Sequence, residues 1–251
     1  MRLPPLTTVL CACSLLATAA FGQQAAITNA PPASTPWDVS AAAGLTLTRG
    51  NSETLLFTAN LLGAKKWDYG KNELNLGADA VYGENDSTKN AESVHGYGQY
   101  NRLFTERLFG YLRLEGLHDA IADIDYRVMI SPGAGYYFIK QTNTTFRAEV
   151  GPGYIYEQDS NGETRSYMSL RLAERFEHRF NESVKIWEAV EVLPQVDRFS
   201  NYIINAEAGV ETTMTKKLSL LTYIQDSYHN EPAAGRLKND LKLVSAVKYK
   251  F

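Results

Sequence analysis

Residues 241–251 read Leu241-Lys-Leu-Val-Ser-Ala-Val-Lys-Tyr-Lys-Phe251, and they alternate in polarity along their whole length. The side chains that fall on one parity are Leu241, Leu243, Ser245, Val247, Tyr249 and Phe251. The other parity holds Lys242, Val244, Ala246, Lys248 and Lys250. Because successive side chains of a β-strand point to opposite faces, this segment predicts a strand with one apolar face and one face rich in lysine.

The same alternation recurs from Trp37 onward, in short segments separated by clusters of turn-forming residues. No segment shows a helical period of 3.6 residues or a long apolar run. Segments 184–197 and 218–229 fit the pattern less well; in the first of them, Glu188 interrupts one parity and Trp187 the other. We predict twelve strands, at residues 37–49, 53–66, 72–83, 90–104, 108–119, 124–140, 145–157, 164–180, 184–197, 202–214, 218–229 and 237–251.

Two features favour a membrane barrel over a soluble sandwich or a lipocalin-like barrel, in which the apolar parity would face inward. Many segments reach the roughly 9–11 residues that a tilted strand needs to cross a bilayer. Aromatic residues also gather at strand ends that would lie on the periplasmic side: Trp37, Trp67, Phe104, Phe138, Phe180, Trp187 and Phe251. All three tryptophans are thereby predicted to lie in one aromatic girdle.

The fold that we expect is all-β, a single closed antiparallel transmembrane β-barrel of about 12 strands with short turns. Closure leaves no unpaired strand edge in lipid, and an even strand count returns both ends of the barrel to the periplasm. A terminal strand that ends on phenylalanine resembles the last strand of bacterial outer-membrane barrels. We therefore expect Tyr249 and Phe251 to act as the membrane-insertion signal.

The N-terminus has the layout of a secretory signal, in which Arg2 precedes an apolar run and the small residues Ala20 and Gly22 occupy the −3 and −1 positions of a cleavage before Gln23. The expected organisation is a signal peptide at 1–22 that is removed, a flexible periplasmic leader at 23–36 and the barrel at 37–251. The expected location after cleavage is the outer membrane of a Gram-negative bacterium. A weaker resemblance of Leu10–Cys13 to a lipoprotein cleavage box ranks below ordinary cleavage.

Composition narrows the chemistry of the mature chain. Both cysteines, Cys11 and Cys13, lie in the predicted signal peptide, so no thiol would remain for a disulfide, a metal or a nucleophile. A formal net charge of −3 for the whole sequence does not favour nucleic acid. The expected partners are outer-membrane lipid, periplasmic chaperones, the barrel-assembly machinery, and small solutes or ions; no cofactor is expected.

Four stretches carry a resemblance to a known family: GLTLTRGNSE at 44–53, HDAIADIDYR at 118–127, PGAGYY at 132–137 and EVGPGYIYE at 149–157. They resemble the family of salt-induced outer membrane proteins, which is built on a domain of unknown function. The resemblance implies an outer-membrane location and a barrel fold, and it supplies no biochemical activity. A stress-associated role is expected only through the family's description, since these residues do not themselves show a link to salt. Within these stretches, Gly50-Asn51 predicts a tight hairpin. The glycines at 133, 135, 151 and 153 would either bare part of the lumen or relieve barrel curvature, and we favour curvature.

The polar parity of the strands predicts a charged inner wall. The expected lumen charges are Arg113, Glu115, Asp125, Arg127, Arg147, Glu149, Arg171, Arg175, Arg179, Glu207 and Glu211, joined by Glu73, Asp79, Glu177, Lys242 and Lys248. Five arginines of segments 124–180 form a basic sector, which we expect to bias conductance toward anions. A polar channel and a plug cross-linked by ion pairs both remain open, because twelve strands fall between filled small barrels and wide porins.

Two further functions are weighed. An outer-membrane lipid hydrolase would need a serine or tyrosine beside a histidine and an orienting polar group. Ser227 lies close to His229 in sequence, but no nucleophile motif surrounds any serine. Together with His95, His118 and His178, His229 is therefore interpreted as a surface or interfacial residue, and no catalytic or metal site is expected. The other alternative is a structural envelope barrel without transport; short outer loops argue against adhesion or receptor work.

Overall fold

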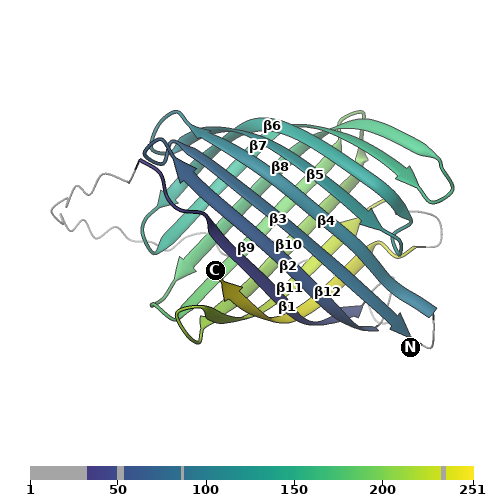
Figure 1. Cartoon of the computed structure of the whole chain (residues 1–251). Helices are drawn as coiled ribbons and strands as arrows, with labels where there is room; N and C mark the ends of the chain where they lie inside the picture. Colours follow the sequence, from purple (N-terminus) through teal and green to yellow (C-terminus); the bar gives the residue numbers. More distant parts are fainter. Residues whose placement is uncertain (1–32, 50–53, 86–87, 233–235) are drawn as a thin grey trace, which may run out of the picture. The chain divides into compact units, whose positions relative to one another are not determined.

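The computed structural model describes residues 33–49, 54–85, 88–232 and 236–251. These residues form one closed antiparallel barrel of twelve strands, in which each strand is hydrogen-bonded to its sequence neighbours and the first strand pairs with the last (Figure 1). No helix in these ranges is long and apolar enough to cross a membrane. The predicted signal peptide, most of the predicted leader and the Gly50-Asn51 turn lie outside the described residues.

The predicted strands agree with the observed ones to within a few residues at each end. The observed strands are β1 (Asp38–Arg49), β2 (Thr54–Trp67), β3 (Asn72–Asn85), β4 (Thr88–Leu103), β5 (Leu108–Asp119), β6 (Ile124–Lys140), β7 (Thr144–Asp159), β8 (Thr164–Arg179), β9 (Val184–Gln195), β10 (Arg198–Thr213), β11 (Leu218–His229) and β12 (Asn239–Lys250). The strand β10 begins earlier than predicted, because Arg198 still pairs with Gln195 before an irregularity in the ladder.

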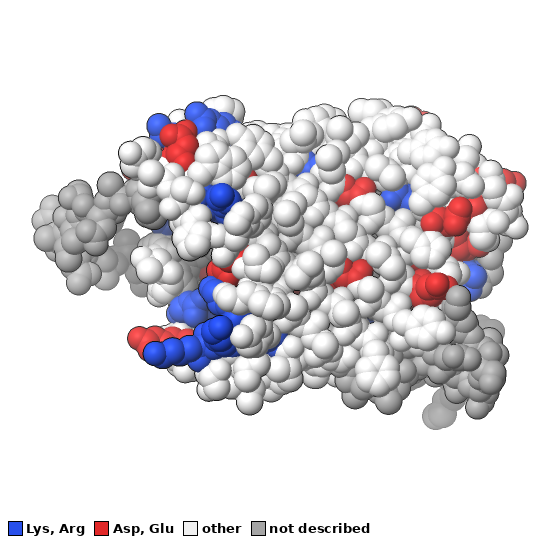
Figure 2. All heavy atoms as spheres, viewed as in Figure 1, with Lys and Arg blue, Asp and Glu red and all other residues white. Residues whose placement is uncertain are grey.

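The apolar parity of the strands faces outward. On β5 and β6, for example, Leu114, Val128 and Ile130 are exposed, whereas Met129 between two of them is buried inside the barrel. Figure 2 shows the consequence on one face, which is mostly uncharged between two ends where charged side chains gather. An outer wall of this kind is the opposite of a soluble barrel, whose apolar face would be turned inward. Apolar surfaces of this extent mark contact with membrane or protein.

One end of the barrel, here called the aromatic end, carries exposed aromatic side chains: Trp37, Phe104, Phe138, Phe180 and Phe251. The prediction for Trp187 was wrong. The Trp187 side chain is buried in the lumen, where the centroid of its ring lies 6.0 Å from the centroid of the Tyr223 ring. Trp187 and Glu188 gave conflicting parities for β9. Glu188 is exposed on the outer face, so the inward parity of this strand is the one that contains Trp187.

The glycines of β6 and β7 make room for aromatic rings on the inner wall. A Cβ atom added to Gly135 would lie 2.2 Å from the ring of Phe109, and one added to Gly133 would lie 2.5 Å from the Tyr111 hydroxyl. A Cβ atom on Gly151 would lie 2.2 Å from the carbonyl oxygen of Pro132 and 2.9 Å from the same tyrosine hydroxyl. Gly153 differs, since its Cβ would meet Ser169 Oγ at 2.6 Å rather than a ring. The lumen is therefore not bare at this place. The rings of Phe109 and Tyr111 on β5 lie over Gly133, Gly135 and Gly151. Neither of the two predicted roles of these glycines, a bare patch of lumen or relief of curvature, includes this packing.

The seam of the barrel lies between β1 and β12. Ten residues of β1 have partners on β12, from Ser40 opposite Lys250 to Arg49 opposite Leu241. The backbone N–H of Phe251 donates to the carbonyl of Val39 at 3.1 Å. The rings of Tyr249 and Phe251 pack edge to face on the outer surface, with centroids 5.1 Å apart.

Candidate functional site: the barrel lumen

A cavity of about 790 Å³ lies inside the barrel, and residues from all twelve strands line it. Its lining extends from Lys66 and Lys248 near the aromatic end to Ser227 and His229 near the opposite end. Spread over an apolar band about 25 Å tall, that volume corresponds to a mean cross-section of about 30 Å² for the centres of water molecules. The interior therefore has room for water and small ions along much of its length.

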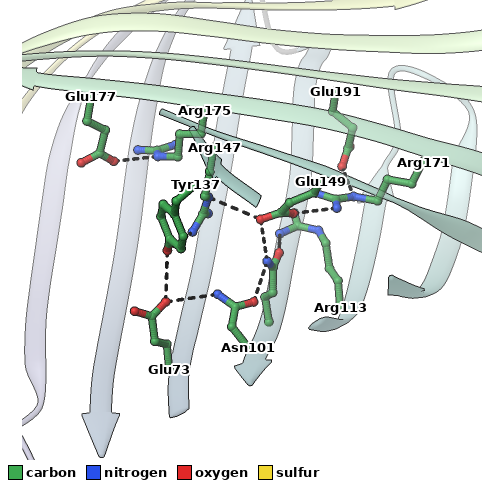
Figure 3. A network of polar contacts seen from close by, with 11 residues as sticks. Glu73, Asn101, Arg113, Tyr137, Arg147, Glu149, Arg171, Arg175, Glu177 and Glu191 are labelled. Carbon is green, nitrogen blue, oxygen red and sulfur yellow. Dashed lines mark hydrogen bonds and ion pairs between the residues drawn. The ribbon is translucent and has the colours of Figure 1, made fainter. Parts of the chain in front are cut away.

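Arg171 on β8 is the centre of a polar network on the inner wall (Figure 3). Its Nε donates to Glu191 Oε1 of β9 at 2.6 Å, and its Nη1 donates to Glu149 Oε2 of β7 at 2.9 Å. Glu149 also accepts a hydrogen bond from Gln99 at 3.0 Å and pairs with Arg147 at 3.3 Å. One guanidinium thus holds together carboxylates from two strands.

The network continues toward β3 through neutral side chains. Gln99 donates to Asn101 Oδ1 at 3.0 Å, and Asn101 donates to Glu73 at 3.4 Å. The hydroxyl of Tyr137 on β6 also donates to Glu73 at 3.3 Å, and Lys66 pairs with the same carboxylate at 2.9 Å. Since β4 and β5 separate β3 from β6 in the sheet, the contact of Tyr137 with Glu73 reaches over two strands and narrows this side of the lumen.

The predicted basic sector is not a free positive surface. Its four arginines that line the cavity are all paired with carboxylates: Arg127 with Glu157, Arg147 with Glu149, Arg171 with Glu149 and Glu191, and Arg175 with Glu177. The partners lie two residues away on the same strand or on an adjacent strand. Outside the sector, Arg113 pairs with Glu115 at 2.7 Å. The expected bias toward anions stays a prediction, but these four arginines are not the free positive charges that it assumed, because each has a glutamate partner.

Two predicted lumen charges lie elsewhere. The ladder between β6 and β7 has an irregularity between Ile124 and Tyr126. Ile124 consequently takes an inward position, while Asp125 is exposed and lies outside the cavity lining. Arg179 is exposed at the aromatic end of β8, also outside that lining. Alternation alone could not anticipate the first difference, since a bulge shifts parity by one residue.

The remaining predicted charges do line the cavity. Glu211 of β10 pairs with Lys185 at 3.0 Å and with Lys248 at 3.1 Å. Glu207 has no lysine or arginine partner among the described residues, and it accepts hydrogen bonds from Trp187 Nε1 at 2.5 Å and from Gln225 at 2.8 Å.

His95 is a lumen residue that the sequence interpretation placed at the surface. Its Nδ1 lies 2.9 Å from Asp79 Oδ1 and its Nε2 lies 3.2 Å from Glu115 Oε1. The sequence does carry a signal for the lumen position of His95, since His95 has the same parity on β4 as the inward-facing Gln99. His178 agrees with its interpretation, since its ring packs edge to face on exposed Phe180 with a centroid separation of 4.6 Å.

Ser227 and His229 do meet in space, with Oγ and Nε2 3.3 Å apart. However, the Ser227 hydroxyl donates to Asn205 Oδ1 at 2.9 Å, and both residues line the lumen cavity rather than the outer wall. A lipid acyl chain would approach from the outside, so this pair does not favour a lipid hydrolase. Within the described ranges, no group of three or more His, Cys, Asp or Glu residues is arranged to hold a metal ion.

A closed antiparallel barrel with an apolar outer wall and a charged, hollow interior has the architecture of outer-membrane porins. The family described as "Protein of unknown function, DUF481" matches residues 41–251, and the chain belongs to that family. No curated protein matches the chain.

Among solved structures, the NanC porin is similar with a TM-score of 0.57 and 10% sequence identity, over 84% of this chain and 100% of that chain. The KdgM porin in complex with disordered oligogalacturonate has a TM-score of 0.49 and 10% identity, over 84% of this chain and 99% of that chain. At such identities the likeness to the NanC porin shows the shared barrel fold alone.

Proposed function

We propose that the protein is an outer-membrane pore for small ions and polar solutes in a Gram-negative bacterium. The observation that carries this proposal is the cavity lined by all twelve strands inside a barrel whose outer wall is apolar. Backbone groups in lipid must be paired within the protein, and a closed barrel meets that requirement. The apolar outer parity supports the membrane location, and the hollow polar interior supports passage rather than chemistry.

The arrangement of ion pairs favours a channel over a plug. A plug needs salt bridges that cross the lumen, whereas most of the pairs here run along the wall. Arg175 and Glu177 lie on one strand, and Arg171 and Glu191 lie on adjacent strands. Pairs of this kind stiffen the wall and leave the centre of the barrel to water.

Because the arginines are paired, we propose that the pore discriminates weakly between small anions and cations. Selectivity follows the net charge that a permeating ion meets, and arginines paired with glutamates add little positive charge to it. This replaces the expected anion preference. The resemblance to salt-induced proteins supports a role in salt stress as a separate part of the proposal, and it predicts that the amount of protein in the outer membrane rises when the bacteria grow in added NaCl.

Planar-bilayer recording on the purified barrel tests the pore. Ala189 lines the cavity, so Ala189→Trp should lower the conductance of each step by filling the lumen. Ala59 is exposed on the outer parity of β2, and Ala59→Trp is the matched control that should leave the step unchanged. The absence of conductance steps from folded wild-type protein would reject the pore and favour a non-conducting structural barrel.

A further inference from the structure

The outer wall of β8 and β9 carries two carboxylates, Glu174 and Glu188, in a surface that is otherwise mostly apolar. Both are exposed. Glu174 is among the residues around the lumen cavity, but the parity of β8 places its side chain outward with Leu172. Glu188 is the cross-strand partner of Phe176 on the same face. Neither carboxylate has a hydrogen bond or an ion pair with any described residue. The carboxylates of the lumen network, by contrast, are paired.

These two residues lie well inside the apolar band. Glu174 is six residues from Phe180 of the aromatic end. With a rise of about 3.3 Å per residue and a tilt of about 40°, that separation places Glu174 about 15 Å above the aromatic ring, within a band about 25 Å tall. Ionisable groups at such a depth are costly in lipid, and they normally have a polar partner. The described residues of this barrel supply no such partner.

Hydroxyl groups occupy the matching position on the other side of β10. Thr222 of β11 and Ser245 of β12 are cross-strand partners, and their hydroxyl oxygens lie 3.4 Å apart. Both have the outward parity. Between the carboxylates and the hydroxyls, the outward residues of β10 include the small Ala206 and Ala208. The five strands from β8 to β12 therefore present carboxylates, alanines and hydroxyls in that order.

The strand register places the two polar groups at one depth. A row of cross-strand partners that starts at Ala41, near the aromatic end of β1, reaches Ser166, near the opposite end of β8. Each such row therefore moves away from the aromatic end as it passes from one strand to the next. With strands about 4.8 Å apart and tilted by about 40°, the step is about 3 Å per strand. The row through Glu188 passes Ala208 and then Ile224. From Glu188 to Ile224 this row crosses two strands and climbs about 6 Å. Thr222 lies two residues nearer the aromatic end than Ile224, and this lowers it by about 5 Å. Thr222 therefore lies at nearly the depth of Glu188.

We propose that this wall is an interface between two copies of the chain in the membrane, related by a two-fold axis that passes through the alanines of β10 parallel to the barrel axis. Such a rotation keeps depth and exchanges the two sides of β10. It brings Glu174 and Glu188 of each copy against Thr222 and Ser245 of the other. The hydroxyls donate to the carboxyl oxygens, and the small alanines let the two walls approach closely. The proposal rests on the membrane location given under the proposed function, and it does not require conduction.

The test is the oligomeric state of the full barrel in lipid nanodiscs and in vesicles. Wild type should be a dimer, and Glu174→Leu combined with Glu188→Leu should weaken dimerisation by at least about tenfold. Because leucine suits a lipid-facing position, this variant should fold. Thr222→Val combined with Ser245→Ala should act in the same direction. Ala208→Cys should form a disulfide between copies, whereas the outward control Ala59→Cys should not.

A monomeric wild type in vesicles would overturn the dimer, as would equal cross-linking of the two cysteine variants. Capture of a different membrane protein that is lost in the leucine variant would also overturn it. Conductance is recorded in planar bilayers fused with the same vesicles. A monomer that conducts would reject the dimer proposal alone, and a dimer that does not conduct would reject the pore proposal alone. Recovery as a soluble monomer would reject both proposals.

Discussion

Replacement of Arg171 by methionine should destabilise the barrel more than any other single change to its ion pairs. Only 5% of the Arg171 side chain is exposed, and it pairs with Glu149 and with Glu191. Without it, Glu149 keeps Arg147 and Gln99. Glu191 keeps one hydrogen bond from Asn205 at 3.3 Å and no cation among the described residues.

Breaking a buried pair by removing one partner costs roughly 3–5 kcal/mol, because a charge stays buried without compensation. Arg171 also lies over the ring of Tyr111, 5.2 Å from its centroid, a contact worth about 1 kcal/mol. The cavity admits water to part of the network, so we expect the lower end of this range, a loss of about 3 kcal/mol. Guanidinium unfolding in detergent micelles, followed by tryptophan fluorescence, measures it.

Arg175→Met is the matched control, since the Arg175 side chain is 36% exposed and pairs with one carboxylate. Exposed pairs contribute about 0–1 kcal/mol, so this change should be nearly silent. The combination of Arg171→Met with Glu191→Gln should recover much of the loss by removing the stranded charge. Equal costs for the two arginines, or no recovery in the combination, would refute the reasoning.

Three further results are expected. Gly135→Ala should cost about 1–3 kcal/mol by overpacking against the Phe109 ring, and Phe109→Leu should restore most of that stability in denaturant melts. Tyr137→Ala should raise single-channel conductance by removing the contact with Glu73, whereas Tyr136→Ala on the outer face should not. The folded protein should migrate faster on gels before heating than after and should fractionate with outer membranes; recovery from the periplasm in soluble form would contradict this.

The strands could be predicted from the sequence because their signal is local. Each strand shows its own alternation, and turns separate it from the next, so errors in one segment do not propagate. The signal failed at β9, where Trp187 and Glu188 support opposite parities and only the completed barrel decides between them. It failed again at Asp125, because a bulge depends on the partner strand and leaves no mark in a single segment.

The chemistry of the lumen was less accessible. The prediction counted arginines, but whether Arg171 is free depends on its register against Glu149 and Glu191 on two other strands. A slip of one residue would turn all of these side chains to the outside. The same limit applies to the glycines, whose purpose becomes clear only when Tyr111 is seen to lie over Gly133.

The seam between β1 and β12 has a consequence for how the barrel comes into being. Eleven of its twelve strand pairings join neighbours in the chain, and one joins residues about 200 positions apart. That pairing requires the costly closure of a very long loop. Until it forms, β1 and β12 both present open edges, which lipid does not tolerate. A partly assembled barrel is therefore not stable in the membrane. Any assembly factor that assists folding would act at the seam, by keeping the edge of β1 paired until β12 binds there.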